Sequence, residues 1–260
     1  MMHTLSMALR LALRELRSGL QGFRIFLACL ILGVSAIAVV GALSSALNTG
    51  IANEGRSLMG GDVEFSTLYD TPSSAQRSFI TEAGQVSKVA TLRAMAAVRD
   101  KASALVEVKV VDDAYPLYGQ LQLEPAIPLQ DALQRDASGR AGTVVEPTLL
   151  ARLDLKVGDI VRVGTSDLVI NAAIVREPDR ISDGFVLGPR LMISADALNA
   201  TGLSRPGSLI KWRYRVALPQ PANNAQVKEI VDEAEPLLQD QGWKVRSREN
   251  AAPGVRRFID

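Results

Sequence analysis

The side chains that most often carry out catalysis are scarce in this chain. His3 is the only histidine and Cys29 the only cysteine among 260 residues. A Ser-His-Asp triad needs a histidine base, and zinc sites draw on histidine and cysteine, so neither chemistry has the residues it requires. A GxxxxGK[ST] loop is also missing from the sequence, which predicts that the chain does not bind ATP through a P-loop.

Two adjacent carboxylate pairs are the remaining candidates for acid–base chemistry. Asp112-Asp113 follows a strand-like run, and Asp232-Glu233 falls in a helical pattern. Neighbouring side chains point to opposite faces of a strand and diverge around a helix, so neither pair directs two carboxylates at one substrate. Solvated faces explain both pairs. We therefore expect no enzyme activity, no metal site and no bound cofactor.

An apolar stretch organises the rest of the chain. Residues 25–47 read IFLACLILGVSAIAVVGALSSAL, without charge or proline. As a helix rising about 1.5 Å per residue, this stretch is roughly 35 Å long, enough to cross a hydrocarbon core of about 30 Å. A buried core helix rarely stays uncharged over such a length, and a cleavable signal peptide has a shorter apolar region of about 7–15 residues. The stretch is predicted to be an uncleaved transmembrane helix.

The charges beside this helix predict its orientation. Residues 1–24 hold four arginines and a single acid, whereas acidic residues are more frequent just after the helix. Arginine-rich flanks stay in the cytoplasm, so residues beyond 47 are predicted to be exported. Leucines spaced by three and four over residues 1–24 predict a cytoplasmic amphipathic leader that lies on the membrane surface.

Small residues form rows along the predicted membrane helix. Such rows let another helix approach closely, so they predict packing against partner membrane helices. The positions that we assign to this packing are Gly33, Ala38, Gly41, Ala42, Ser45 and Ala46.

The region beyond the helix is large and nearly neutral. The chain has 29 basic and 28 acidic residues, and residues 1–24 contain four and one of them, which leaves the remainder at net −2. A surface close to neutral lacks the basic patch that nucleic acids require. About 210 residues suffice for one large or two small domains, and the lone cysteine allows no disulfide within the chain.

Alternating strand patterns and short helices predict an α+β fold, mainly antiparallel, over residues 60–250. The segment GGDVEF at 60–65 superficially resembles the signature of diguanylate cyclases. Directly behind an anchor, on the side where no nucleoside triphosphate is available, a glycine break that enters a strand is the better interpretation. The further expected strands lie at 85–99, 104–111, 143–145, 160–163, 168–175, 191–194, 208–218 and 243–245, and the expected helices at 71–83, from 147, at 195–200 and at 225–241.

Two local patterns carry more detailed predictions. Gly158 offers positive φ and Asp159 can bond to nearby backbone, which predicts a tight turn before the strand 160–163. In the strand 208–218, basic residues alternate with apolar and aromatic ones, which predicts one buried face and one wet face.

Proline, glycine and tyrosine between 115 and 128 follow no clear period. This run predicts a joint between two lobes, one containing the hairpin 85–111 and the other the strands 143–175. A second polar, turn-rich run, residues 176–190, is predicted to be an exposed loop. Because loops on a rigid scaffold often carry recognition, Asp183, Gly184 and Phe185 are candidate contacts for a partner, with a solvated connector as the alternative.

The order of these parts resembles ABC transporter permeases of the MacB/FtsX type. The residues that carry the resemblance are the basic leader, the single anchor, the Gly-Gly-Asp strand start and VVEPTLLARLDLKVGD at 144–159. REPDRISDGFVLGPRLMIS at 176–194 and the terminal PGVRRFID look closer to the branch associated with lysophospholipases or thioesterases. The resemblance assigns 25–47 to the first membrane helix, 60–250 to the periplasmic core domain and 251–260 to the start of a helix leading to a second membrane segment.

The resemblance implies a permease subunit of a bacterial inner membrane that couples cytoplasmic ATP hydrolysis to periplasmic handling or export of hydrophobic, lipid-like cargo. The implied partners are a separate ATP-binding subunit, other permease membrane helices, a periplasmic thioesterase or lysophospholipase, and membrane lipid. The alternative is a membrane-anchored periplasmic binding or sensor protein without an ATPase. Neighbouring genes, and whether the native protein continues past Asp260, would separate these hypotheses.

Overall fold

The computed structural model describes residues 25–42, 55–68, 72–99, 102–180, 188–205, 207–219, 223–238 and 242–248. The chain divides into two units, Met1–Ile51 and Ala52–Asp260, and the second is called the sheet domain below. The predictions for the leader 1–24, for residues 43–47 and for the terminal segment 251–260 lie outside the described residues.

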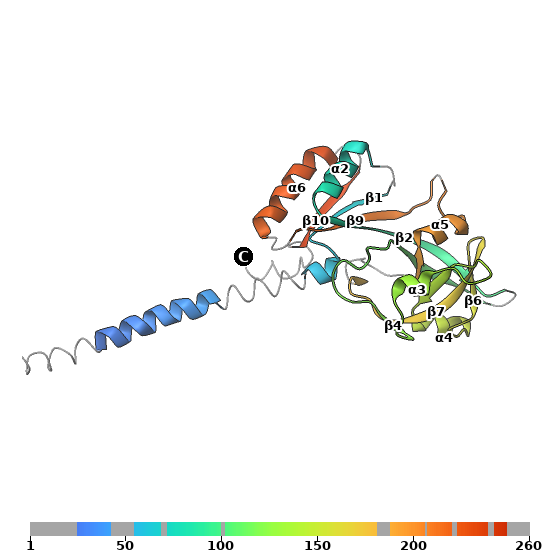
Figure 1. The fold of residues 1–260 in the computed structure, drawn as a ribbon, viewed down its shortest axis with the longest axis horizontal. Coiled ribbons are helices and arrows are strands. Elements are labelled where there is room, and N and C mark those ends of the chain that lie inside the picture. Colours follow the sequence, from blue (N-terminus) through green and yellow to red (C-terminus); the bar gives the residue numbers. More distant parts are fainter. Residues whose placement is uncertain are drawn as a thin grey trace, which may run out of the picture. The chain divides into compact units, whose positions relative to one another are not determined.

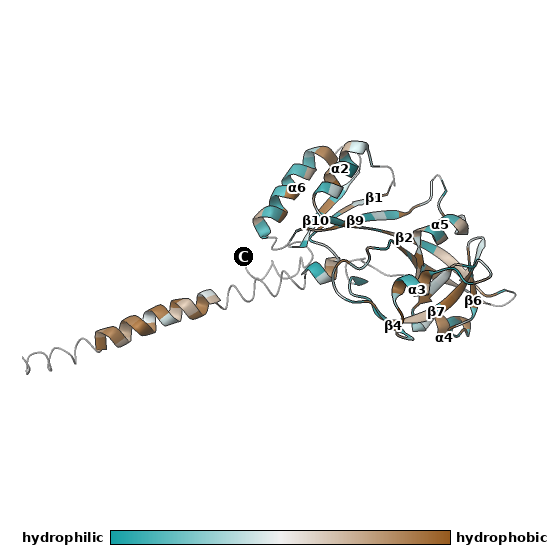
Figure 2. Ribbon diagram, viewed as in Figure 1, coloured by the Kyte–Doolittle hydropathy of each residue, from teal (hydrophilic) through white to brown (hydrophobic). Residues whose placement is uncertain are grey.

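The first unit contains one apolar helix, Ile25–Ala42, of 18 residues with a mean hydropathy of 2.7. It is long and apolar enough to cross a membrane (Figure 2). Its side chains are exposed in the structure. Among the described residues it is the one helix with these properties. The prediction of one apolar helix ahead of a mixed α+β domain is confirmed.

The sheet domain follows the expected succession of strands and helices (Figure 1). Its strands are β1 (Val63–Thr67), β2 (Gln85–Ala97), β3 (Ser103–Val111), β4 (Gln122–Glu124), β5 (Gly142–Val145), β6 (Ile160–Val163), β7 (Ser166–Arg176), β8 (Arg190–Ser194), β9 (Lys211–Ala217) and β10 (Lys244–Ser247). Its helices are α2 (Ser74–Glu82), α3 (Leu129–Leu133), α4 (Pro147–Leu153), α5 (Ala195–Thr201) and α6 (Asn224–Leu238). Residues 55–59 are also helical.

Six strands close into a small barrel. The pairings run from β2 to β3, β8, β5, β7 and β6, and β6 returns to β2 through Ala96 opposite Val163. Two of these pairings, β3 with β8 and β5 with β7, are parallel, and the others are antiparallel. Inward-facing apolar residues such as Val106, Val161 and Leu168 fill the barrel. Apolar residues of α3, β5 and β7 contribute to a second buried cluster.

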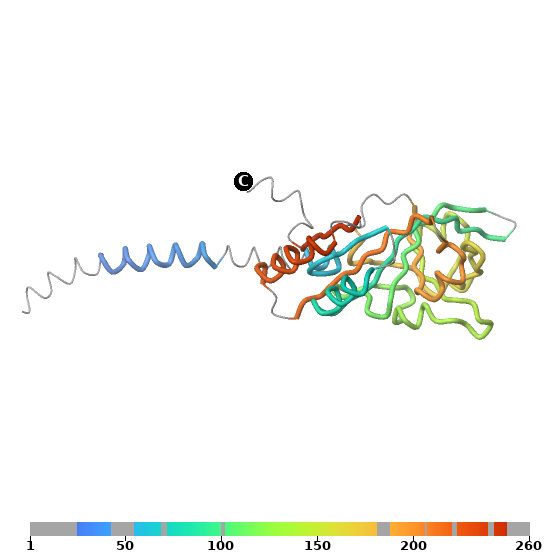
Figure 3. Tube along the Cα trace, turned by 90° about the horizontal axis from the view of Figure 1, so that it is seen from above, coloured from blue at the N-terminus to red at the C-terminus, as the bar shows by residue number. Residues whose placement is uncertain are grey.

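The long strand β2 leaves the barrel and continues into a second part of the same sheet. There it pairs with β9, which pairs with β1, and β1 pairs with the edge strand β10. Helices α2 and α6 lie on one face of these strands (Figures 1 and 3). Their apolar residues, among them Ile80, Val227 and Leu238, pack against Phe65 and Val216.

The predicted joint between two lobes at residues 115–128 is wrong. The hairpin of β2 and β3 and the strands of 143–175 belong to one continuous sheet and enclose one barrel core. The physical reason is that β8, which follows the run 176–190, inserts between β3 and β5 and joins both regions. The segment 115–128 itself contains β4 and leads into α3, two elements that the sequence patterns do not reveal.

Local turn and capping signals agree with the structure at one site and differ at another. The turn at Gly158 is confirmed, with φ +99° and with Asp159 Oδ2 accepting a hydrogen bond from the amide of Lys156 at 2.8 Å. Helix α2 instead begins later than predicted, because Ser73 and Gln76 form a capping box. Ser73 rather than Thr71 is therefore the N-cap.

Candidate functional site

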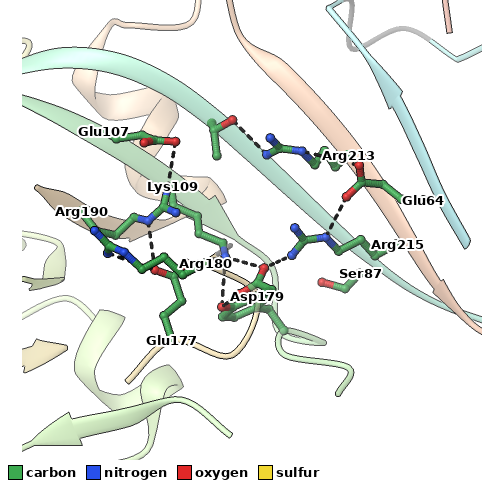
Figure 4. A network of polar contacts seen from close by, with 12 residues as sticks. Glu64, Ser87, Glu107, Lys109, Glu177, Asp179, Arg180, Arg190, Arg213 and Arg215 are labelled. Carbon is green, nitrogen blue, oxygen red and sulfur yellow. Dashed lines mark hydrogen bonds and ion pairs between the residues drawn. The ribbon is translucent and has the colours of Figure 1, made fainter. Parts of the chain in front are cut away.

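The most unusual feature of the sheet domain is a set of charged side chains buried where the barrel meets β1 and β9 (Figure 4). Removing ions from water is costly unless each finds an opposite charge and satisfied hydrogen bonds. The members that we call the central network are Glu64, Glu107, Lys109, Tyr115, Glu177, Asp179, Arg190, Arg213 and Arg215.

Lys109 on β3 lies at the centre of this network. Its Nζ is 2.7 Å from Glu177 Oε1, 2.7 Å from Asp179 Oδ2 and 3.0 Å from Tyr115 Oη, and its side chain is fully buried. The strand places Lys109 on the face opposite the barrel interior, since Val108 and Val110 face the core. The ammonium group thus uses its three donors on three partners, which satisfies it away from water.

Two arginines of β9 extend the network to β1. Arg215 is paired with Asp179 through Nη1 and with Glu64 Oε2 through Nε at 3.2 Å. Arg213 Nε lies 3.8 Å from Glu64 Oε1, and its Nη1 donates to Thr91 Oγ1 at 3.1 Å. Glu64 is near both arginines because β1 pairs with β9 in a register that places Glu64 opposite Arg215. One carboxylate of β1 is therefore shared by two cations of β9.

Arg190 connects the other side of the network to the barrel. Its Nε lies 3.1 Å from Glu177 Oε2 and its Nη1 3.0 Å from Glu107 Oε1. The backbone amide of Arg190 donates to Glu146 Oε2 at 2.8 Å, and Glu146 Oε1 is paired with Arg180 at 2.5 Å. Residues 177–180 are thus held by charges from β3, β8, β9 and the start of α4.

Burial and charge act in opposite directions on the carboxyl group of Asp179. Burial alone would raise its pKa, but the positive charges of Lys109 and Arg215 and the hydrogen bonds from Lys109 and Tyr115 hold the pKa well below its usual range. The pKa of Tyr115 is raised, chiefly by burial and by the negative charges of Asp179 and Glu177. Asp179 is therefore ionised and Tyr115 is a neutral hydrogen-bond donor at neutral pH.

A second buried cluster, which we call the Asp62 clamp, lies at the start of β1. Asp62 Oδ1 accepts from Arg56 Nε at 2.7 Å and from Arg248 Nη1 at 2.5 Å. Its Oδ2 accepts from Tyr118 Oη at 2.7 Å and from the amide of Leu218 at 3.0 Å. Burial alone would raise the pKa of Asp62, but these hydrogen bonds and the charge of Arg56 lower it. The clamp holds the first and last described segments of the sheet domain.

The chemistry of both clusters favours holding elements together over turnover. The carboxylates of the central network are engaged by cations, and Lys109 Nζ lies 2.7 Å from two of them. Apart from Glu107, the network residues are buried. Within the described ranges, no group of three or more His, Cys, Asp or Glu residues is arranged to hold a metal ion.

The residues singled out from the sequence lie elsewhere. Gly33, Ala38, Gly41 and Ala42 are on the helix Ile25–Ala42, whereas Ser45 and Ala46 lie outside the described residues. Their role in helix packing stays a prediction. The candidate contact residues Asp183, Gly184 and Phe185 also lie outside the described residues.

Substituting the small residues tests that packing role. We expect Gly41→Leu to weaken association with partner membrane helices while membrane insertion persists, because a bulky side chain keeps a neighbouring helix from close approach. The measurement is recovery of partner subunits after purification in a mild detergent, with Val39→Leu as the control that changes size within an already large side chain. If partner subunits were recovered equally well with Gly41→Leu and with the parent, the row of small residues would have no role in helix packing.

Two expectations about charged residues are corrected by the structure. The run 176–190 is not simply an exposed loop, because Glu177, Asp179 and Arg190 are buried. The predicted wet face of the strand 208–218 is also wrong at Arg213 and Arg215, which are buried against Glu64 and Asp179. In both cases an opposite charge from a distant part of the chain supplies the solvation that water would otherwise give.

Comparison with known proteins gives a clear relative. No family model matches the sequence. The chain is 30% identical over 227 residues to the uncharacterised ABC transporter permease YbbP of Escherichia coli (strain K12), covering 85% of this chain and 27% of the relative. The chain thus spans about a quarter of the length of that relative. The resemblance to ABC transporter permeases inferred from the sequence is confirmed by this relative.

Among solved structures, the periplasmic region of MacB from Actinobacillus actinomycetemcomitans aligns with a TM-score of 0.49 and 9% identity. The alignment covers 80% of this chain and 97% of that chain. The extracellular domain of the noncanonic ABC-type transporter YknZ from Gram-positive bacteria aligns with a TM-score of 0.46 and 14% identity, covering 71% of this chain and 100% of that chain.

Proposed function

We propose that this chain, which matches an ABC transporter permease over 85% of its length, forms part of a permease subunit. The sequence match is the observation that carries the proposal. In this proposal a separate ATP-binding subunit hydrolyses ATP in the cytoplasm, and the resulting motion reaches the sheet domain through the membrane helices. The domain then handles hydrophobic, lipid-like cargo and contacts a periplasmic hydrolase.

The described contacts support a role in transmitting motion. A domain that passes on a displacement must move as a body, and one continuous sheet with a buried ionic network resists internal shear. The Asp62 clamp further ties residues 56 and 248 to each other through one carboxylate. A displacement applied at residue 56 or at residue 248 is thus passed on to β1 through the Asp62 clamp.

The proposed partner contact remains at Asp183, Gly184 and Phe185. Support comes from their flanks: Asp179 and Arg190 are fixed in the central network on either side of these residues. A recognition loop benefits from rigid ends, because less conformational freedom is lost when it binds. The network is therefore proposed to position this loop without itself touching the partner.

The proposed orientation has the N-terminus in the cytoplasm and the sheet domain in the periplasm. Four arginines before the apolar helix favour this arrangement. Protease added to intact spheroplasts is expected to remove the sheet domain while a tag at Met1 stays protected. Permeabilised spheroplasts, in which the tag must also be cleaved, provide the control. Digestion of the tag with protection of the sheet domain would contradict the orientation.

A further inference from the structure

A groove of about 850 Å³ lies beside the central network on the sheet domain. Its walls come from the residues after β1, from β2 and β3, and from the segment leading into β9. Register explains why these parts meet there, since Thr67 is opposite Trp212 and Thr91 is opposite Lys211. The lining residues that give the groove its chemistry are Leu68, Arg93, Leu203, Leu209, Lys211 and Arg213, and we call this surface the Leu209 groove.

Several residues that line the Leu209 groove are apolar. Leu209 is 82% exposed and Leu68 is 50% exposed, although both are large aliphatic side chains. Leu203 and the buried Ile210 also line the groove. Scattered exposed leucines are common on proteins, but several that line one concavity mark a place where apolar material can be removed from water.

Positive charges outnumber negative ones among the lining residues. Arg93, Lys211 and Arg213 line the groove together with one carboxylate, Glu107. The carboxylate of Glu107 is also paired with Arg190 Nη1 at 3.0 Å, so it offsets only part of the positive charge that lines the groove. Arg213 is held in place by Thr91, while Arg93 is exposed and Lys211 is partly exposed. The exposed guanidinium of Arg93 and the partly exposed side chain of Lys211 thus line the same groove as the exposed leucines.

We propose that the Leu209 groove binds the monomer of a single-chain amphiphile with an anionic headgroup, a carboxylate or a phosphate. The headgroup lies between Arg93 and Lys211, and the alkyl chain runs along Leu68, Leu203 and Leu209. A concave site of this volume suits one chain, whereas a bilayer surface would require a flat or convex apolar face. This inference rests on the proposed function, because the handling of lipid-like cargo would supply the ligand. It adds the chemical class of that cargo.

The test uses the full-length protein in nanodiscs of zwitterionic lipid, without ATP, so that it is independent of transport. The probe is a long-chain fatty acid that carries a photoreactive diazirine near the end of its chain. After irradiation, mass spectrometry is expected to place the label on residues 203–213. Excess decanoate should compete for this labelling, whereas decyltrimethylammonium, with the same chain length and opposite charge, should not.

Variants of the groove separate the contributions of its apolar and its charged residues. Leu209→Asp should abolish labelling of residues 203–213, and Arg93→Gln and Lys211→Gln should each reduce it about threefold to tenfold through loss of a charge-assisted contact. The matched controls are Leu237→Asp and Arg77→Gln, exposed residues of α6 and α2, which should label like the parent. Tryptophan fluorescence of each variant checks that the sheet domain is folded.

Several outcomes would overturn the proposal. Equal competition by decyltrimethylammonium would make the groove a non-specific apolar surface. Labelling confined to the helix Ile25–Ala42 would show partition into the lipid only. A groove buried between two copies of the chain would leave residues 203–213 unlabelled. If the groove labels as expected but ATP is not hydrolysed by any associated subunit, the binding site stands and the proposed function fails.

Discussion

Replacing Asp179 by alanine is expected to lower the free energy of unfolding of the sheet domain by about 3–5 kcal/mol. The substitution removes the carboxylate that accepts from Lys109, Tyr115 and Arg215, and it leaves two buried cations with less negative charge around them. Trp212 and Trp243, the only tryptophans, both lie in the sheet domain, so their fluorescence follows its unfolding in urea.

A surface ion pair provides the matched control for Asp179. Asp167 is paired with Arg162 at 2.7 Å, but both side chains are partly open to water. Asp167→Ala should therefore leave the urea midpoint nearly unchanged. The double variant Asp179→Ala, Lys109→Met should lose less stability than the sum of the single variants, because the two residues share one interaction. Additive losses would mean that Asp179 and Lys109 are not coupled.

The same network predicts how stability depends on pH. The pKa of Asp179 is lower in the folded protein than its value of about 3.9 in unfolded chains. Its contribution to stability is therefore present above pH 4 or so and is lost as the pH falls below that range. The parent should lose urea resistance progressively as the pH falls from about 4 toward about 2, and Asp179→Ala should lose markedly less over that range.

Replacing Asp62 by asparagine is expected to release both ends of the sheet domain. The change removes the charge that holds Arg56 and Arg248 and leaves these guanidinium groups near a neutral amide. Breaking a buried pair on one side costs about 3–5 kcal/mol, and the retained amide oxygen lowers that cost toward about 2 kcal/mol. Hydrogen exchange should therefore accelerate in residues 55–60 and 244–248 before it does so in the barrel.

The control for the clamp is Asp232→Asn on the exposed face of α6. It changes the same functional group without removing a described ion pair partner, so exchange in residues 55–60 and 244–248 should match the parent. If Asp62→Asn accelerated exchange uniformly across the domain, the clamp would be a general contribution to stability rather than a local tie between the two segments.

Local signals in the sequence are sufficient to predict most elements of the fold. The apolar run 25–47, the proline at the start of α4 and the Gly158-Asp159 turn each act over a few residues, and the structure has a helix or a turn at each place. The closure of the barrel could not be predicted in this way. It depends on pairing β8 between β3 and β5, and partners so far apart in sequence leave no local pattern.

The candidate site escapes sequence-based prediction for a related reason. Charged residues alternating along a strand predict a wet face, and that rule fails when another segment brings opposite charges to the same place. A signal is present nonetheless: Lys109 interrupts the apolar run of β3, and Glu64, Arg213 and Arg215 lie inside strands whose neighbours are apolar.

The association of the full-length protein with an ATP-binding subunit tests the permease function most directly. The measurement is ATP hydrolysis by the tagged native protein, expressed with the products of neighbouring genes and purified from membranes in a mild detergent. We expect an ATP-binding subunit to co-purify and vanadate-sensitive ATP hydrolysis to accompany it. Purified protein that retains no nucleotide-binding subunit and hydrolyses no ATP, although its sheet domain is folded, would contradict the permease function.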